Sequence, residues 1–407
     1  MGLFFLKPRK YPHSENKKHF TIIIRAHDEE DVIADSVKSA LKVDYPKDKF
    51  SVVVFAHNCA DKTAKIARDL GAKVLEFSDF KKEHCTLGYS MQTGLNILKS
   101  HNHQTDYFVL IDADNQIDQN YLNACNNAAN AGVKVGRVFE NSRNLTDNMI
   151  SCMSGLWYIR DSHVACSTRS ALHLGCVMNG PTSVIDKNIA YRWDAIGSSE
   201  DLEFTLKRLL YDNLIVEYIN EAILYEDQPS SLDDVFKRNS RMGNGLNKLF
   251  WKLGIRCLFK FFKCFFKRDV SWSVKFSLLD QYSNIAIIPG SFVACVWFPL
   301  YYIYSLFYTG LVGPITIWGL GTYSLLWFTI FILVVLALAL FVPFWLQPLI
   351  SYLSEKKRIV IKNKKTVIIS IIVFPVFMVI NAVAIIKGIT SKGKWSKIKR
   401  SHTTIDQ

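Results

Sequence analysis

Residues 107–115 read YFVLIDADN, an apolar run that ends in two aspartates one residue apart. Tyr107–Ile111 has the composition of a strand buried in a parallel sheet. Asp112 and Asp114 would lie at its carboxyl end, where ligands bind on such sheets. Two carboxylates at this spacing can reach one hard cation, such as the Mg²⁺ or Mn²⁺ that accompanies nucleotide diphosphates. The alternative is that the pair only caps a turn.

Short apolar runs and helical stretches alternate on the N-terminal side of this stretch. TIIIR (21–25), SVVVF (51–55) and residues 73–77 predict strands. The intervening residues predict helices that end near Tyr45, at Leu70 (followed by a Gly71 stop) and near Lys99. This alternation predicts an α/β domain over residues 1–245, with a doubly wound, mainly parallel sheet.

The character of the chain changes after about residue 245. The net charge of +13 belongs largely to the C-terminal part, where basic clusters adjoin apolar runs. LNKLFWKLGIRCLFKFFKCFF (246–266) contains no acid, and we expect residues 246–270 to form a basic amphipathic helix at a membrane interface. The alternative is a basic helix that packs on the core. Without a zinc knuckle, helix-turn-helix or aromatic ribonucleoprotein pattern, the basic surplus favours membrane lipids over nucleic acid.

Three apolar runs, at 284–308, 322–344 and 366–386, are each long enough to cross a bilayer. We therefore expect a multi-pass cell-membrane protein with a cytosolic catalytic domain, about three or four helical segments over 284–388 and a basic tail over 389–407. The basic clusters at 355–365 and 387–400 both look cytosolic. Three crossings cannot place the catalytic domain and both clusters on one side, so the number of crossings stays open.

Two further motifs carry charged side chains suited to catalysis. SSEDLE (198–203) places Glu200 and Asp201 at the start of a predicted helix, where one carboxylate could deprotonate an acceptor hydroxyl or merely interact with the helix dipole. KRNSRMG (237–243) offers Arg238 and Arg241, which could grip phosphate oxygens or form a collar against lipid headgroups. The nine cysteines contain no CxxC pair, as expected of reduced thiols in the cytosol.

In their order along the chain, these pieces resemble the family 2 glycosyltransferases, in the membrane-bound branch of hyaluronan, chitin, cellulose and poly-N-acetylglucosamine synthases. The resemblance rests on a series of motifs from the first strand to the tail: TIIIRAHDEEDVI, NCADKTAKIARDLGAKV, DADN, NLTDNMISCMSGLWYIRD, SSEDLEF, YEDQPSS, RNSRMGNG and residues 395–402.

The resemblance implies a GT-A-type nucleotide-sugar domain, an inverting mechanism and a divalent metal, Mg²⁺ or Mn²⁺. Asp112 would contact the nucleotide or metal, and Asp114 would ligate the metal. Asp201 matches the catalytic base, with Glu200 beside it near the acceptor. The donor site would include Glu29, His57, Asp112, Arg238 and Arg241, and Arg241 matches the arginine of the family's QxxRW motif.

Several positions depart from the family pattern. Arg25 stands where the family has proline, Asp28 where it has asparagine, and His57 where an aspartate contacts the base. The remaining departures are Leu87 for lysine, Arg238 and Met242 for the glutamine and tryptophan of QxxRW, and a glycine-rich acceptor loop reduced to Asn179–Thr182.

The expected function is inverting transfer of a sugar from a nucleotide-diphospho-sugar, with a UDP-sugar as the expected donor, to a glycan or lipid-linked acceptor in cell-surface polysaccharide synthesis. Two alternatives stay open. One is a single sugar addition to polyprenyl phosphate, and the other is a degenerate, non-catalytic membrane subunit of a synthase complex, which the departures would favour.

Overall fold

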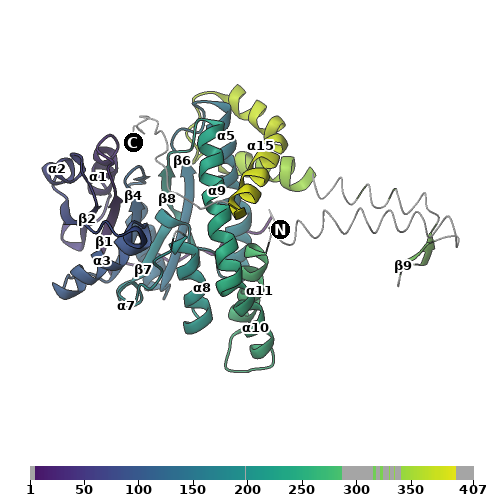
Figure 1. Ribbon diagram of the computed structural model, residues 1–407, viewed down its shortest axis with the longest axis horizontal. Helices are drawn as coiled ribbons and strands as arrows, with labels where there is room; N and C mark the ends of the chain where they lie inside the picture. The colour runs from purple at the N-terminus through teal and green to yellow at the C-terminus, as the bar shows by residue number, and fades with distance from the viewer. Residues whose placement is uncertain are drawn as a thin grey trace.

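The computed structural model describes residues 5–197, 199–286, 315–317, 321–323, 330, 334 and 341–390. They form an eight-stranded sheet with helices on both faces and a separate two-stranded ribbon, β9 (Ile315–Ile317) with β10 (Gly321–Tyr323) (Figure 1). The order of the large sheet is β3-β2-β1-β4-β7-β6-β8-β5.

The first half of the sheet is parallel, as the sequence predicts. β1 pairs in parallel with β2 and β4, and β2 with β3. Gly71, at φ +95°, follows the second helix in the left-handed conformation that glycine tolerates. The predicted strands are confirmed to within two residues, whereas the first helix ends at Leu41, before the expected Tyr45. In chain order the elements are β1 (Phe20–Ala26), α1 (Ile33–Leu41), β2 (Phe50–His57), α2 (Thr63–Asp69), β3 (Lys73–Phe77), α3 (Leu87–Ser100) and β4 (Tyr107–Asp112).

The second half of the sheet is mixed, so the expectation of a mainly parallel sheet is corrected to a mixed one. β7 runs antiparallel to both β4 and β6, and β5 antiparallel to β8, while β6 and β8 are parallel. A parallel pair needs a crossover that returns the chain to the same end of the sheet, and the chain enters β7 from the opposite end. The elements are β5 (Gln116–Ile117), α4 (Tyr121–Asn130), β6 (Val135–Ser142), α5 (Met149–Arg160), the π-helix η3 (Asp161–Cys166), α6 (Ser167–Ala171), β7 (Ser183–Asp186), α7 (Lys187–Ala190), α8 (Glu200–Asp212) and β8 (Glu217–Glu226).

Alternate residues of the parallel strands fill two separate cores. Ile22 and Ile24 of β1 lie with residues of α1, α2 and α4 on one face, and Ile23 lies with residues of α3 and α5 on the other. Successive side chains of a strand point to opposite faces, so a strand with helices on both sides is apolar throughout. This arrangement explains the unbroken runs TIIIR and YFVLI, and it fixes the strand ends that carry the site.

Residues 246–270, expected to form one interfacial helix, belong to several elements that pack on the domain. The end of α9 (Leu232–Leu249), the π-helix η5 (Phe250–Gly254), α10 (Ile255–Cys264) and α11 (Trp272–Ile285) share a core with Leu202, Leu206 and Leu209 of α8. Trp251, Phe259, Phe262 and Phe266 lie on the outside and are exposed. One face of this segment therefore packs on the core, as the alternative reading expected. The other face exposes aromatic side chains, as an interfacial helix would.

The C-terminal part contains η6 (Val342–Leu346), α14 (Gln347–Glu355) and α15 (Lys364–Thr390). In the described part of the chain, α15 is the one helix long and apolar enough to cross a membrane, by length and composition alone. It includes the predicted segment 366–386. The predicted segments 284–308 and 322–344 lie mainly outside the described residues, as does the tail beyond residue 390.

Candidate active site

The side chain of Arg25 joins the two acidic motifs. β1 and β4 place Arg25 beside Asp112 in register. The Nε and Nη2 atoms of Arg25 lie 2.8 and 2.6 Å from Oδ1 of Asp112, and Nη1 lies 2.8 Å from Oε1 of Glu200. The Arg25 side chain is 1% exposed. The acids after β4 and the acidic start of α8 therefore converge, as predicted, through an arginine that the motifs did not identify as a site residue.

Charge balance accounts for this arrangement. Burial alone lowers the pKa of the Arg25 guanidinium, but the negative charges of Asp112 and Glu200 outweigh burial and hold that pKa above its ordinary value. Burial raises the pKa of Glu200, an effect that Arg25 opposes and that neighbouring Asp201 reinforces. Removing the guanidinium would leave two acids facing each other with little water between them.

The Asp112–Asn115 turn is held by its own backbone and by Asn115. The amide N–H of Asp112 donates to Oδ1 of Asn115 at 2.8 Å, and the amide of Asn115 donates to the carbonyl of Asp112 at 3.0 Å. Asp114 is buried, whereas the Asp112 side chain is 29% exposed. Both bonds from Arg25 go to Oδ1 of Asp112, and no described residue bonds its Oδ2, so Oδ2 could bind a ligand.

Asp201 lies against the loop that the resemblance assigns to the acceptor. Its Oδ2 accepts a hydrogen bond of 2.8 Å from the amide of Gly180. Gly180 has φ +35°, and a Cβ there would lie 3.3 Å from Nη2 of Arg25 and 4.0 Å from Oδ2 of Asp201. Glycine therefore lets the backbone of this loop approach Asp201 and Arg25 closely.

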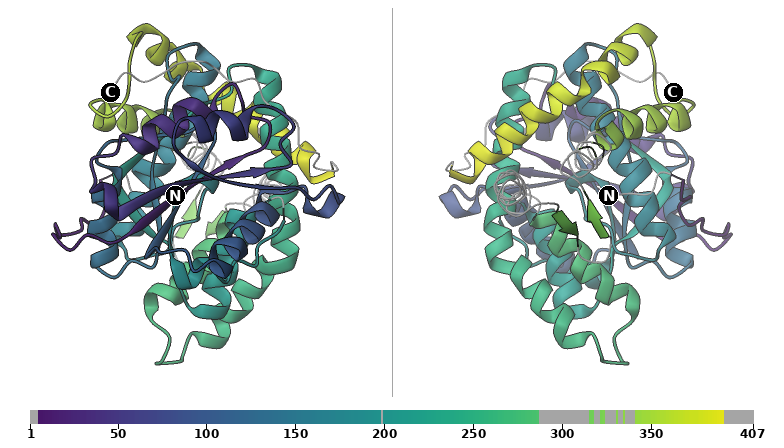
Figure 2. Two further views of the ribbon diagram at one scale, coloured as in Figure 1. Left: turned by 90° about the vertical axis from the view of Figure 1, so that its left-hand side faces the viewer. Right: turned by 90° about the vertical axis from the view of Figure 1, so that its right-hand side faces the viewer.

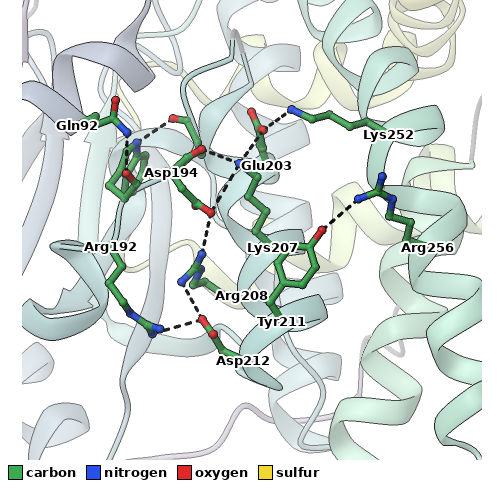
Figure 3. A network of polar contacts seen from close by, with 12 residues as sticks. Gln92, Arg192, Asp194, Glu203, Lys207, Arg208, Tyr211, Asp212, Lys252 and Arg256 are labelled. Atoms are coloured by element: carbon green, nitrogen blue, oxygen red, sulfur yellow. Dashed lines mark hydrogen bonds and ion pairs between the residues drawn. The ribbon is translucent and has the colours of Figure 1, made fainter.

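A network of ion pairs fixes the start of α8 (Figure 3). Oε1 of Glu203, in the first turn, lies 3.1 Å from Nζ of Lys207 and 2.7 Å from Nζ of Lys252 in η5. Further along α8, Arg208 contacts Asp194 at 3.0 Å and Asp212 at 2.8 Å. The basic segment at 246–270 therefore helps to position the helix that carries Asp201.

A second pair of acids lies next to the first, at the ends of β6 and β8. Glu140 is fully buried and Glu226 is half-buried, and their carboxyl groups interact directly. Burial, followed by the charge of Glu140 and the hydrogen bond with it, raises the pKa of Glu226 well above its ordinary value. Oε2 of Glu140 accepts from Asn179, and Oε2 of Glu226 accepts from Gln228 at 3.0 Å. A proton on Glu226 would let it donate a hydrogen bond to Glu140 and would relieve the repulsion between the two acids.

The two arginines of the predicted diphosphate clamp have different surroundings. Arg238, in α9, donates to Oε1 of Gln228 at 3.0 Å and stacks over the Tyr158 ring, which ties it to the Glu140–Glu226 pair. Arg241 lies one turn further on and is half-buried. Among the described residues it has no hydrogen bond or ion pair with Asp112, Glu200 or Asp201, so the structure does not bring it into their cluster.

The predicted nucleotide residues lie at the ends of the neighbouring strands. Glu29 follows β1, is buried, and its amide donates to Oγ1 of Thr63 at 2.8 Å. His57 ends β2 and stacks on Phe77 with ring centroids 5.2 Å apart. Burial lowers the pKa of His57, and its Nε2 has no hydrogen-bond partner among the described residues. A neutral imidazole with one nitrogen unused, beside an aromatic ring, suits a flat ligand ring.

Sequence reasoning missed Arg25 and the Glu140–Glu226 pair as site residues. A charged residue within the apolar run TIIIR was a signal, because a buried arginine needs an acidic partner. Nothing in the local sequence distinguishes Glu140 or Glu226 from an exposed acid on a strand.

The residues present fit a divalent cation at Asp112 and Asp114. These acids are hard oxygen ligands, and Mg²⁺ is commonly held by one or two carboxylates with substrate phosphates. The described residues also bring ligand atoms of Asp28, Cys59 and Asp61 within 4.8 Å of one another. There, both aspartates already accept backbone N–H bonds, and burial raises the pKa of the Cys59 thiol to about 11, so this second group suits a metal less well.

Comparison with known proteins agrees with this geometry. The model of the family described as "Glycosyltransferase like family 2" matches residues 17–245. The probable glycosyltransferase YdaM of Bacillus subtilis (strain 168) is 25% identical over 270 residues, which are 63% of this chain and 61% of the relative. The chain therefore spans less than two thirds of the length of that relative.

Solved structures of two proteins match parts of this chain, and the first has a similar fold. The mannosyltransferase PcManGT from Pyrobaculum calidifontis, in complex with GDP-Man and Mn²⁺, superposes with a TM-score of 0.52 at 12% identity, over 94% of this chain and 91% of that one. S. aureus TarS 1-349 in complex with UDP-GlcNAc gives a TM-score of 0.42 at 14% identity, over 66% of this chain and 72% of that one.

The family match extends over β1, the aspartate turn and the start of α8, the three elements that Arg25 joins. The prediction of a glycosyltransferase domain with a GT-A-like α/β fold is therefore confirmed, although its sheet is mixed and not mainly parallel. Because the matched residues are more than half of the chain, this protein belongs to glycosyltransferase family 2.

Proposed function

We propose that this protein transfers a sugar, with inversion, from a nucleotide-diphospho-sugar to a glycan or lipid-linked acceptor at the cytosolic face of a membrane. The observation that carries the proposal is the joining of Asp112 and Glu200 by Arg25, with Asp201 beside Glu200 at the Gly180 amide. This arrangement gathers the predicted donor acids, acceptor acid and base at one edge of the sheet.

Asp201 is the proposed general base. Its Oδ2 would take the proton of an acceptor hydroxyl while the hydroxyl oxygen forms a bond to the anomeric carbon of the donor sugar and the nucleotide diphosphate leaves. The Gly180 amide holds the carboxylate in place, and α8 is fixed by Glu203 and Lys252. A divalent cation held by Asp112 and Asp114 would neutralise charge on the departing diphosphate.

His57 and Glu29, at the ends of β2 and β1, would line the nucleotide. Arg238 is held by Gln228 and Tyr158 and would contact the pyrophosphate of the donor. Arg241 is retained as a second phosphate contact that would form only with donor bound.

The exposed aromatic residues and lysines of η5 and α10 support the membrane location, because this composition suits an anionic lipid surface. Membership of the branch of membrane-bound polysaccharide synthases is part of the same proposal. Single addition to polyprenyl phosphate is the alternative, and the sizes of the products distinguish it: one sugar per lipid or a ladder of lengths.

The test is a donor screen with the purified full chain. UDP-sugars and GDP-mannose are supplied separately with Mg²⁺ or Mn²⁺ and with lipid or glycan acceptors, and release of nucleotide diphosphate and product mass are measured. The proposal expects cation-dependent transfer by the wild type and none by Asp201→Asn. Failure to turn over or to bind any donor in the presence of cation would favour the non-catalytic subunit and overturn the proposal.

A further inference from the structure

Helix α15 is covered by the catalytic domain along one side. Val367, Phe374, Phe377 and Ala384 are at most 1% exposed, and the helix packs on α5 and α9. Figure 2 shows α15, in yellow, running across the outside of the domain. A helix that crosses a bilayer as a free anchor would not have one side covered along its length by the soluble domain.

Glycines bring the backbones of α9 and α15 into contact near the C-terminal end of α15. A Cβ on Gly243 would lie 2.2 Å from the carbonyl oxygen of Ile385, and one on Gly388 would lie 2.1 Å from that of Ser240. Nδ2 of Asn239 also donates to Oδ1 of Asn381 at 2.6 Å. Both amides are buried, so separating the helices would leave polar groups without partners in an apolar setting.

The opposite side of α15 is an apolar stripe, which we call the α15 stripe. Its members are 51% to 63% exposed: Ile368, Ile372, Val376, Val379, Val383 and Ile386. Spacings of three and four residues place them on one face of the helix. Lysines lie at both ends, at Lys364, Lys365 and Lys387, and Trp345 donates from its indole to the carbonyl of Ile372.

Both ends of the region between α11 and η6 are held on the same domain. α11, which ends at Ile285, packs on α8, and α14, which begins at Gln347, packs on α5. Any crossings between these two ends must therefore be even in number. The β9–β10 ribbon, between them in sequence, lies far from the sheet in Figure 1.

The basic cluster before α15 is also held on the domain. Nδ1 of His163 lies 2.7 Å from Oε1 of Glu355, and the guanidinium of Arg358 lies over the Phe139 ring, with its carbon 3.9 Å from the ring centroid. The amide of Lys362 donates to Oγ1 of Thr146 at 3.1 Å. Residues 355–362 are therefore on the side of the membrane where the catalytic domain is.

We propose that α15 lies flat between the catalytic domain and an anionic bilayer, with its stripe in the lipid, and that it does not cross. The chain beyond α15 then stays on the catalytic side. This inference rests on the membrane location in the proposed function. Three crossings could not place the catalytic domain and both basic clusters on the same side of the membrane. If α15 does not cross, the basic residues at both of its ends lie on one side of the membrane and this conflict disappears.

The test measures depth along the stripe. In the full chain with Cys59, Cys85 and Cys295 changed to serine, a nitroxide is attached to one cysteine at a time, at Ile368→Cys, Ile372→Cys, Val379→Cys or Ile386→Cys. The protein is reconstituted in vesicles that contain phosphatidylglycerol. Electron paramagnetic resonance with oxygen and a water-soluble nickel chelate gives the depth of each probe, and Lys65→Cys, exposed on α2, is the control in water.

A flat helix predicts the same shallow depth, within a few ångströms, at all four positions. Ile368 and Ile386 are 18 residues apart, so a crossing helix would separate them in depth by about 27 Å, and that gradient would overturn the proposal. Probes reached by the nickel chelate as readily as the control would also overturn it. So would probes shielded from both reagents, which indicate a second copy on the stripe.

Sugar transfer is measured on the same reconstituted samples. Loss of transfer with uniform shallow depth would contradict the proposed function and leave the docking intact. Full transfer with a depth gradient would support the proposed function and contradict the flat position of α15.

Discussion

Two pairs of acids lie next to each other at one edge of the sheet, and they are neutralised by different means. Asp112 and Glu200 share the guanidinium of Arg25, whereas we expect Glu140 and Glu226 to share a proton, because burial and the charge of Glu140 raise the pKa of Glu226. The charge of Asp112 also acts on Glu226, so the pairs are electrostatic neighbours. A guanidinium stays charged at every physiological pH, but a shared proton is lost as the pH rises.

The difference separates two roles. The guanidinium gives the arginine-bridged pair a fixed positive counter-charge beside the proposed base, where the donor and the cation would bind. The Glu140–Glu226 pair accepts hydrogen bonds from Asn179 and Gln228, and Gln228 in turn holds Arg238, so this pair supports the expected acceptor loop and Arg238. We expect substitutions in the first group to affect transfer most, and substitutions in the second to change the pH dependence of stability.

The largest effect is expected for Asp201→Asn. The amide keeps the shape and can still accept from Gly180, but it cannot take a proton, so the rate of transfer should fall on the order of 10³-fold. Donor affinity, measured by calorimetry, should be nearly unchanged. Glu221→Gln on β8 is the control; an unchanged rate for Asp201→Asn would remove this residue from the mechanism.

Next is Arg25→Gln, which leaves Asp112 and Glu200 without a counter-charge. Breaking a buried ion pair by removing one partner costs about 3–5 kcal/mol, so the free energy of unfolding in urea should fall by that order. Arg25→Lys retains the charge and should recover part of the loss. Equal stability of the glutamine, lysine and wild-type proteins would show that the bridge is unimportant.

The third prediction concerns Glu226→Gln and pH. The folded-state pKa of Glu226 is raised, so its contribution is present at low pH and is lost as pH rises above the unfolded value of about 4.3. Wild-type stability should therefore decline with rising pH up to the folded-state pKa, by as much as about 1.4 kcal/mol per unit. The glutamine can donate to Glu140 at any pH and should flatten that decline in thermal melts between pH 5 and 8. Parallel curves for the two proteins would contradict the shared proton.

The smallest effect is expected for Lys252→Met. This lysine pairs with Glu203 but its side chain is 58% exposed, so water screens the pair. Such pairs contribute about 0–1 kcal/mol, and Lys207 remains beside Glu203. A loss of several kcal/mol in urea unfolding would show that α8 depends on η5 more than on its own ion pairs.

The fold was predictable wherever a short stretch of sequence, such as an apolar run or a helix-ending glycine, determines the local structure. The apolar runs of β1 to β4 are buried on both faces, so each is continuous enough to identify alone, and Gly71 marks a real left-handed stop. The mixed second half was not predictable, because β7 is four residues long and its direction depends on the path of the chain around it.

The same division holds for the membrane part. Composition identifies 246–270 as apolar and basic and 366–386 as apolar, but only contacts show that each has one side on the domain. Length and hydropathy cannot distinguish a helix that crosses a bilayer from one that lies between a bilayer and a protein.

The sequence by itself determined the strand-and-helix alternation, the aspartate turn after β4 and the acidic start of α8, because each depends on neighbours within a few residues. The tertiary structure decided which charges meet. Arg25 is 87 residues from Asp112 and 175 from Glu200 in the sequence. Glu140 and Glu226 meet because β6 and β8 are neighbouring strands. Such pairs form only when distant segments are buried together, since burial is what makes an isolated charge costly enough to require a partner.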